Sequence, residues 1–353
     1  MTSRKSQARA ALNALLARYL GDERSSGEQE LIDGLFVDPG DGTGWLMGVG
    51  ELSVSFRPGR PVTVRSLAEV LQRRTLDGSL AQAGLRWGAG MLDRLAALTS
   101  SPYAAPLFRE IYEMLYLRDV AEPAPVFRFG VSVELGGGAP VLKVYFDLFA
   151  TKAERRRDAL EHIAALLGET PGLEAWKRAC PAVDLDTSRV IGVDFGAGNA
   201  VRTKFYWGAR RLTWEDIVSA EQEISGGRHA GTLHRLREVC GDPGALSSVL
   251  VSICAAGGVR SMKLDVCVAR LYADDGEAYE AIERFRGPSV GIEGPAPFDL
   301  VSGGIEPRRT KCVQQYLGVE LPPDRSERVT IYYRPVGLET EHLNPALRPR
   351  MCA

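Results

Sequence analysis

Val201-Arg202-Thr203-Lys204-Phe205-Tyr206-Trp207 is the most informative stretch of this 353-residue chain, because a basic residue stands two positions before a tyrosine in a β-rich run. The same pattern occurs at Lys143-Val144-Tyr145, and weaker copies occur at Lys263-Leu264-Asp265 and Thr330-Ile331-Tyr332. The copies fall roughly 60 residues apart, which suggests an internal supersecondary repeat. Residues i and i+2 of a strand point to one face. Strands that lie side by side would therefore gather the cations and phenols into one site for an anion with aromatic surface beside it.

Pairs of β-rich segments flank turns that contain Gly, Pro, Asn or Asp, and this arrangement predicts hairpins. The five pairs are Leu46–Phe56 with Arg60–Leu67, Val126–Glu134 with Val141–Phe149, Arg189–Phe195 with Val201–Trp207, Ser248–Ala255 with Ser261–Ala269, and Cys312–Leu321 with Arg328–Arg334. Helical patterns separate them: Ser6–Leu20, Ser79–Leu98, Pro106–Leu117, Lys152–Leu167, Trp214–Ile224, Thr232–Cys240 and Glu277–Arg286.

The order of these elements predicts an α+β fold. Hairpin connections favour antiparallel pairing. Ten antiparallel strands with one polar and one apolar face can close into a barrel, with helices on the apolar outside and a polar lumen. We expect a single domain over residues 1–353, and the alternative is two α+β domains that divide near Val183.

Composition excludes several classes of protein. The formal net charge of -2 argues against a general nucleic-acid binder. The six cysteines are scattered without a C-x-x-C pair, which indicates reduced thiols in a cytoplasmic protein. The N-terminal pattern resembles neither a signal peptide nor a membrane anchor, and no apolar run approaches the length of a membrane span. We expect a monomer or a homodimer.

Arginine and lysine on neighbouring strands suit a di- or triphosphate, since arginine offers a bidentate fork and lysine a point charge. Taken alone, any one Lys-x-Tyr pair also fits an exposed strand face with extended lysines. The chain contains no Walker-type loop and no aspartate-rich motif for magnesium, and His229 and His234 are expected at the surface. We therefore expect no cofactor and no metal, and chemistry that depends on carboxylate, lysine, arginine and tyrosine.

In these motifs the chain resembles the dimethylallyltryptophan synthase-type aromatic prenyltransferases of the ABBA fold, in particular bacterial-like members that act on indole. Arg202-x-Lys204-x-Tyr206 and Lys143-x-Tyr145 are similar to that family's diphosphate-binding strands. Gly50-Glu51-Leu52-Ser53, followed by Phe56, is similar to its first strand, and Arg65 matches the arginine of the next strand. Helices and hairpins repeated five times are the prenyltransferase (PT) barrel of this family, so the resemblance covers nearly the whole chain.

The resemblance implies a role for each matching residue. Glu51 would contact the indole N–H and act as the catalytic carboxylate, and Arg189 would meet the carboxylate of the acceptor. The diphosphate would be held by Arg65, Lys143, Arg202, Lys204 and Lys263, with Tyr145, Tyr206 and Tyr332 as a tyrosine shield. The chain departs from the family at Asp265, where a tyrosine is expected, and at Asp38–Trp45, where an Asp-Asp-His-Thr-Pro stretch is missing.

The implied activity is metal-independent, Friedel–Crafts-type transfer of a prenyl group, dimethylallyl above all, from its diphosphate to an aromatic ring in secondary metabolism. The indole of tryptophan or of a tryptophan-derived compound is the expected acceptor. Two alternatives stay open. One is a prenyltransferase for a phenol, a peptide or a polyketide. The other is a diphosphate- or nucleotide-binding module without chemistry, which gives Glu51 no role.

Overall fold

The computed structural model describes residues 4–22, 25–36, 45–72, 78–117, 129–136, 138–148, 151, 155–196, 201–241, 243–256, 258–286 and 298–335. The expected turn residues 197–199, the stretch 38–44 and Cys352 lie outside these ranges. The strands are β1 (Trp45–Phe56), β2 (Thr63–Gln72), β3 (Phe129–Leu135), β4 (Val141–Asp147), β5 (Ser188–Phe195), β6 (Val201–Gly208), β7 (Val249–Ala255), β8 (Val259–Val266), β9 (Gln314–Leu321) and β10 (Arg328–Tyr333).

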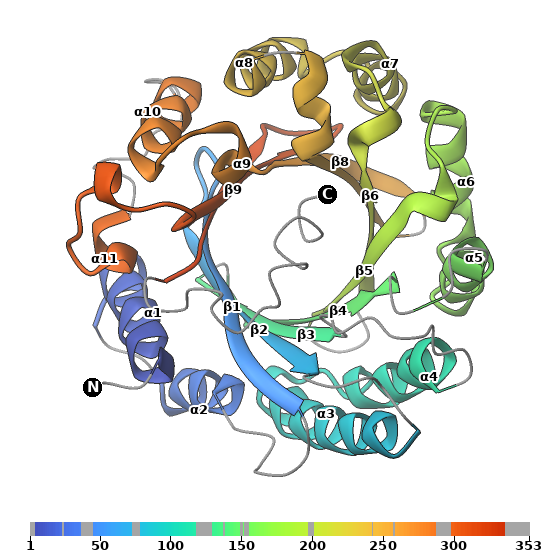
Figure 1. Cartoon of the computed structure of the whole chain (residues 1–353). Coiled ribbons are helices and arrows are strands. Elements are labelled where there is room, and N and C mark those ends of the chain that lie inside the picture. Colours follow the sequence, from blue (N-terminus) through green and yellow to red (C-terminus); the bar gives the residue numbers. More distant parts are fainter. Residues whose placement is uncertain are drawn as a thin grey trace.

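These strands form one closed antiparallel barrel, in which each strand pairs with its neighbours in sequence and β1 pairs with β10 (Figure 1). The predicted barrel and its five hairpins are thus confirmed. The hairpin turns all lie at one end of the barrel, which we call the hairpin end, and the helical connections leave from the other, which we call the helix end. Strands before and after Val183 join through the β4–β5 pairing.

Helices surround the barrel (Figure 1). They are α1 (Arg4–Leu20), α2 (Ser26–Leu35), α3 (Gly78–Thr99), α4 (Ala104–Tyr116), α5 (Arg156–Leu166), α6 (Thr170–Ala179), α7 (Trp214–Ser225), α8 (Ala230–Cys240), α9 (Val268–Leu271), α10 (Asp275–Arg286) and α11 (Phe298–Ser302). The sequence analysis missed α2, α6 and the two short helices α9 and α11. None of the helices in the described part of the chain has the length and apolar character needed to cross a membrane.

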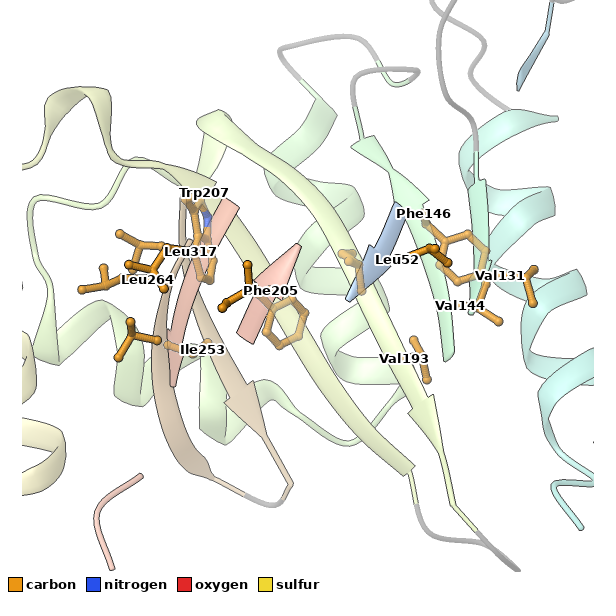
Figure 2. Close-up of a cluster of buried hydrophobic side chains, with 14 of the residues drawn as sticks. Leu52, Val131, Val144, Phe146, Val193, Phe205, Trp207, Ile253, Leu264 and Leu317 are labelled. Carbon is orange, nitrogen blue, oxygen red and sulfur yellow. The ribbon is translucent and has the colours of Figure 1, made fainter. Parts of the chain in front are cut away.

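The outer face of the barrel is apolar and packs against the helices. Figure 2 shows this layer, in which Val144 and Phe146 of β4 lie on one side and Phe205 and Trp207 of β6 on the other. All four are buried, and the indole of Trp207 stacks at 5.7 Å on that of Trp176 from α6. Because side chains alternate along a strand, the residues between them point into the lumen.

The seam that closes the barrel joins its first strand to its last. Leu52–Phe56 of β1 runs antiparallel to Val329–Tyr333 of β10. Inside the lumen, the hydroxyl groups of Ser55 and Thr330 share a hydrogen bond of 2.8 Å across this seam.

One expectation about a histidine is wrong. His229 is 3% exposed rather than at the surface, and its Nε2 lies 2.7 Å from the carbonyl oxygen of Pro322. The ring thereby ties the start of α8 to the β9–β10 turn, which is a role in packing. Cys180, Cys240 and Cys254 are buried and have free thiols in this structure.

Candidate active site in the barrel lumen

The lumen brings together the basic residues that were singled out in separate repeats. Near the hairpin end, one small cavity is lined by Ser55, Arg65, Glu134, Lys143, Lys204, Lys263, Glu320, Arg328, Thr330 and Tyr332. The free space between these side chains is about 20 Å³, room for one water molecule. The cations are folded onto neighbouring carboxylates, and they would have to turn toward a bound diphosphate.

Asp194 is the centre of this charged layer. It lies opposite Lys143 on β4 and opposite Arg202 on β6. Its Oδ2 is 3.5 Å from Lys143 Nζ and 3.2 Å from Lys204 Nζ, and it accepts a hydrogen bond of 3.0 Å from Arg202 Nε. Burial alone would raise the pKa of Asp194, but these three cations hold that pKa well below its usual range.

A second group of charges adjoins Asp194. Glu134 accepts hydrogen bonds from Lys143 Nζ at 2.6 Å and from Arg328 at 2.8 Å. Glu320 accepts one of 2.8 Å from Ser261 Oγ. Burial would raise the pKa of Glu320, yet the nearby Arg202, Arg328 and Lys204 lower it to about 2. Lys143 and Arg328 likewise overcome the effect of burial and hold the pKa of Glu134 well below its usual range, so both carboxylates are ionised at neutral pH.

Burial has the opposite effect on the lysines of this layer. It lowers the pKa of Lys143 to about 8, against the pull of Asp194 and Glu134. For Lys204, burial also acts to lower the pKa, but Asp194 together with Tyr145 and Glu320 outweighs it, and the pKa is raised. Both ammonium groups are thus protonated at pH 7 and can donate to an anion.

The tyrosines form the next layer toward the helix end. The rings of Tyr145 and Tyr206 meet edge to face at 6.4 Å. The guanidinium of Arg65 lies 5.0 Å from the centroid of Tyr332, and the Lys263 ammonium lies 4.7 Å from it. Burial raises the pKa of Tyr206 and of Tyr332 well above the usual value, so both are neutral phenols. Their faces can stabilise a cation between them.

Two glycines make room for these rings. A Cβ on Gly192 of β5 would lie 3.0 Å from the ring of Tyr145 and 3.5 Å from that of Tyr206. A Cβ on Gly318 of β9 would lie 2.8 Å from the ring of Tyr332 and 2.9 Å from Lys263 Nζ. Wall positions without a side chain are therefore required where the tyrosines and Lys263 cross the lumen.

Glu51 and Arg65 connect the charged layer with the tyrosine layer. Arg65 donates to Glu51 Oε1 at 2.6 Å, to the Tyr145 hydroxyl at 2.7 Å and to Ser53 Oγ at 3.0 Å. Burial raises the pKa of Glu51 to about 7, although Arg65 opposes this shift. A carboxylate with such a pKa is suited to accept a proton near neutral pH.

Arg189 lies apart from the other expected site residues. It sits at the start of β5, beside a bulge between Ser188 and Val190. It lines a small recess with Gly208, Arg210, Leu250 and Tyr316. A Cβ on Gly208 would lie 3.0 Å from Arg189 Nε, so the arginine rests directly on the glycine backbone. The recess is at the helix end, beyond the tyrosines, and the role of Arg189 toward an acceptor stays a prediction.

The sequence analysis missed Arg328 and the carboxylates among the cations. Arg328-Val329-Thr330-Ile331-Tyr332 has the same spacing as Arg202-Thr203-Lys204-Phe205-Tyr206, so a signal for Arg328 was present. Lys263, which adjoins the noted departure at Asp265, donates to Asp265 Oδ1 at 2.5 Å and also to the Tyr332 hydroxyl. It therefore does line the lumen.

No model of a protein family matches this sequence, and no curated protein matches it. Solved structures of prenyltransferases have a similar fold. The 5-dimethylallyl tryptophan synthase of Streptomyces coelicolor, in complex with DMASPP and Trp, has a TM-score of 0.71 at 19% identity, with 95% of this chain and 96% of that chain covered. The 6-dimethylallyltryptophan synthase of Micromonospora olivasterospora, also with DMASPP and Trp, has 0.71 at 18%, covering 94% and 97%. The prenyltransferase PriB in its apo form has 0.69 at 20%, covering 94% and 96%. At such identities, the likeness establishes the fold of this chain as the PT barrel.

Proposed function

We propose that this chain is an aromatic prenyltransferase that transfers a dimethylallyl group from dimethylallyl diphosphate to the indole of tryptophan or of a tryptophan-derived compound. The observation that carries this proposal is the two-layered lumen. Cations of five strands converge near the hairpin end, and the tyrosine rings lie directly above them. The barrel is shared with the two synthases whose structures contain DMASPP and Trp, which supports this donor and this acceptor.

In the proposed reaction, the bond between C1 of the prenyl group and the diphosphate oxygen breaks, and the electron pair leaves with the diphosphate. Arg65, Lys143, Arg202, Lys204, Lys263 and Arg328 would stabilise that negative charge. Positive charges gathered around a leaving group in this way act by electrostatic stabilisation. The allyl cation would lie against the faces of Tyr145, Tyr206 and Tyr332, which attract a cation by about 0.5–2 kcal/mol each.

The ring carbon of the acceptor then attacks the allyl cation, and a C–C bond forms. The ring is left with a positive charge and loses a proton, which restores its aromaticity. Glu51 is the proposed group that takes this proton or stabilises the positive ring through the acceptor N–H. Its carboxylate lies between the cations and the tyrosines, and its pKa of about 7 leaves a large ionised fraction at neutral pH.

A prenyltransferase for phenols, peptides or polyketides would bind its donor in the same charged layer. Only the acceptor distinguishes such an enzyme from one that acts on indoles. The test is incubation with dimethylallyl diphosphate and a panel of indoles and phenols, in excess chelator. We expect prenylated indoles at an undiminished rate with chelator. Turnover of phenols alone would move the assignment to the phenolic class. Diphosphate binding without any product would indicate a binding module, and activity that collapses with chelator and returns with magnesium would contradict the metal-independent step.

We further propose that the protein works in the cytoplasm, as a monomer or a homodimer. Its buried free thiols, Cys180, Cys240 and Cys254, support a reducing compartment.

A further inference from the structure

The charged layer, where the proposed donor would bind, contains buried carboxylates that a diphosphate site does not need for binding. Glu134, Asp194 and Glu320, which we call the counter-charge residues, are 3–4% exposed or lie in the same cavity wall as the cations. They are ionised among Arg202, Lys143, Lys204 and Arg328. A bound diphosphate would lie beside these negative charges, and like charges at such distances repel strongly inside a protein.

We propose that the counter-charge residues compete with the diphosphate for the lumen cations, and that this competition weakens the binding of the inorganic pyrophosphate product and speeds its release. The inference rests on the proposed function, because it assigns a second role to the same donor site. In the free enzyme the counter-charge residues hold the cations, and in the enzyme with bound diphosphate they repel the anion.

The contacts of Asp194 suit cations that exchange between this carboxylate and a diphosphate, rather than a fixed ion pair. Its Oδ2 serves Lys143, Lys204 and Arg202 at once, while its Oδ1 is buried and has no hydrogen-bond partner among the described residues. One carboxylate oxygen therefore contacts three cationic side chains, which can turn from it to a phosphate.

At Glu320, the negative charge can be removed without loss of the local hydrogen bond. Among the described residues, its one side-chain hydrogen bond comes from the neutral Ser261 hydroxyl, while Arg202, Arg328 and Lys204 act on it through space. Glutamine at this position keeps an acceptor oxygen for Ser261 and removes only the charge. If the counter-charge residues oppose the anion, this change must tighten the binding of an anion. If they only support the wall, it must not.

The prenyl chain makes the effect selective for the product. The intact donor also contacts the tyrosine faces, so it gains binding energy that inorganic pyrophosphate lacks. Weakening the diphosphate contacts by a common amount leaves the donor bound and lets the product leave. Product release limits turnover in many enzymes, and a pyrophosphate held by unopposed cations would leave slowly.

The experiment is a calorimetric titration of sodium pyrophosphate and, separately, of dimethylallyl thiolodiphosphate into the wild type, Glu320→Gln and Asp194→Asn. Asp186→Asn is the matched control, because Asp186 pairs at 3.2 Å with Arg157 on the exposed surface outside the barrel. We expect Glu320→Gln to bind pyrophosphate about tenfold more tightly than the wild type, and Asp186→Asn to be unchanged. Steady-state turnover of Glu320→Gln should then show stronger inhibition by added pyrophosphate.

Asp194→Asn provides a second variant in case Glu320→Gln does not fold. It should also tighten pyrophosphate, by a smaller factor, because Lys143 loses one of the two carboxylates that keep it protonated. Pyrophosphate affinity that stays equal or falls in a folded variant, while the wild type binds, would overturn the inference and leave the proposed function standing. If neither the wild type nor a variant binds either ligand, the proposed function fails and the inference fails with it.

Discussion

Glu51→Gln tests the assignment of the base with little disturbance of its surroundings. Glutamine has the same shape, and its Oε1 can still accept the hydrogen bond that Arg65 donates at 2.6 Å. The ion pair becomes a hydrogen bond from the cationic Arg65 to a neutral amide oxygen, which changes donor affinity by about 1 kcal/mol, or about fivefold. Loss of a general base lowers turnover by a factor of about 10²–10⁴. A loss of turnover of at least about a hundredfold, set against a change of affinity of about fivefold, leaves a difference of about twentyfold or more. Turnover should therefore fall by at least that much more than the affinity for dimethylallyl thiolodiphosphate.

The pKa of Glu51 adds a second, independent measurement. Burial raises this pKa to about 7, and the base is active only when it is deprotonated. Turnover of the wild type should thus fall as the pH falls through 7, since the ionised fraction drops from about 90% at pH 8 to about 10% at pH 6. The residual activity of Glu51→Gln should lack this step. Asp93→Asn, which makes the same change opposite Arg109 on the exposed surface, is the control. Normal turnover in Glu51→Gln, or an unchanged pH step, would refute the role of Glu51.

Lys204→Ala and Arg202→Ala should each weaken donor binding and lower kcat/KM by about tenfold or more, because a lost charge-assisted contact costs about 1.5–3 kcal/mol; kinetics within twofold of wild type would mean that this face is solvated and no site. Gly318→Ala should impair turnover because its Cβ would meet the Tyr332 ring at 2.8 Å, whereas Gly231→Ala, with open space around its Cβ, serves as the control; equal activity of the two variants would count against a crowded lumen. The lowered pKa of Glu320, about 2 in the folded chain, stabilises the fold above the ordinary glutamate pKa, and this contribution is lost as the pH falls from about 4.5 toward 2. Denaturant unfolding at pH 5, 4 and 3 should show a steeper loss for the wild type than for Glu320→Gln, and parallel curves would contradict it.

The hairpins and the inward-facing residues were predictable because both depend on local sequence. Glycine- and proline-containing turns mark the ends of strands, and the spacing of two in Arg202-Thr203-Lys204-Phe205-Tyr206 places its polar residues on one face whatever the rest of the chain does. Asp194 illustrates what local sequence leaves open. Its contact with Lys143 requires the pairing of β4 with β5, which are separated by α5 and α6.

The two missed full-length helices have different explanations. α2 carries a local signal, a capping box in which Ser25 and Glu28 satisfy each other's backbone N–H groups, and this signal was overlooked. α6 begins with Thr170-Pro171-Gly172, which reads as a turn. Pro171 nevertheless fits the first turn of a helix, and burial of Trp176 against Trp207 outweighs the poor helix propensity of Gly172.

The seam between β1 and β10 has a consequence for biosynthesis. Arg328, Thr330 and Tyr332 belong to the last strand of the described chain, and Ser55, the hydrogen-bond partner of Thr330, is made 275 residues earlier. The ribosome must therefore synthesise every strand from β1 to β10 before the donor site has all its walls. Until then, β1 has an open edge that could pair with another nascent chain. Contacts so distant in sequence also slow folding, so the interval between synthesis and closure is when this protein most needs a chaperone.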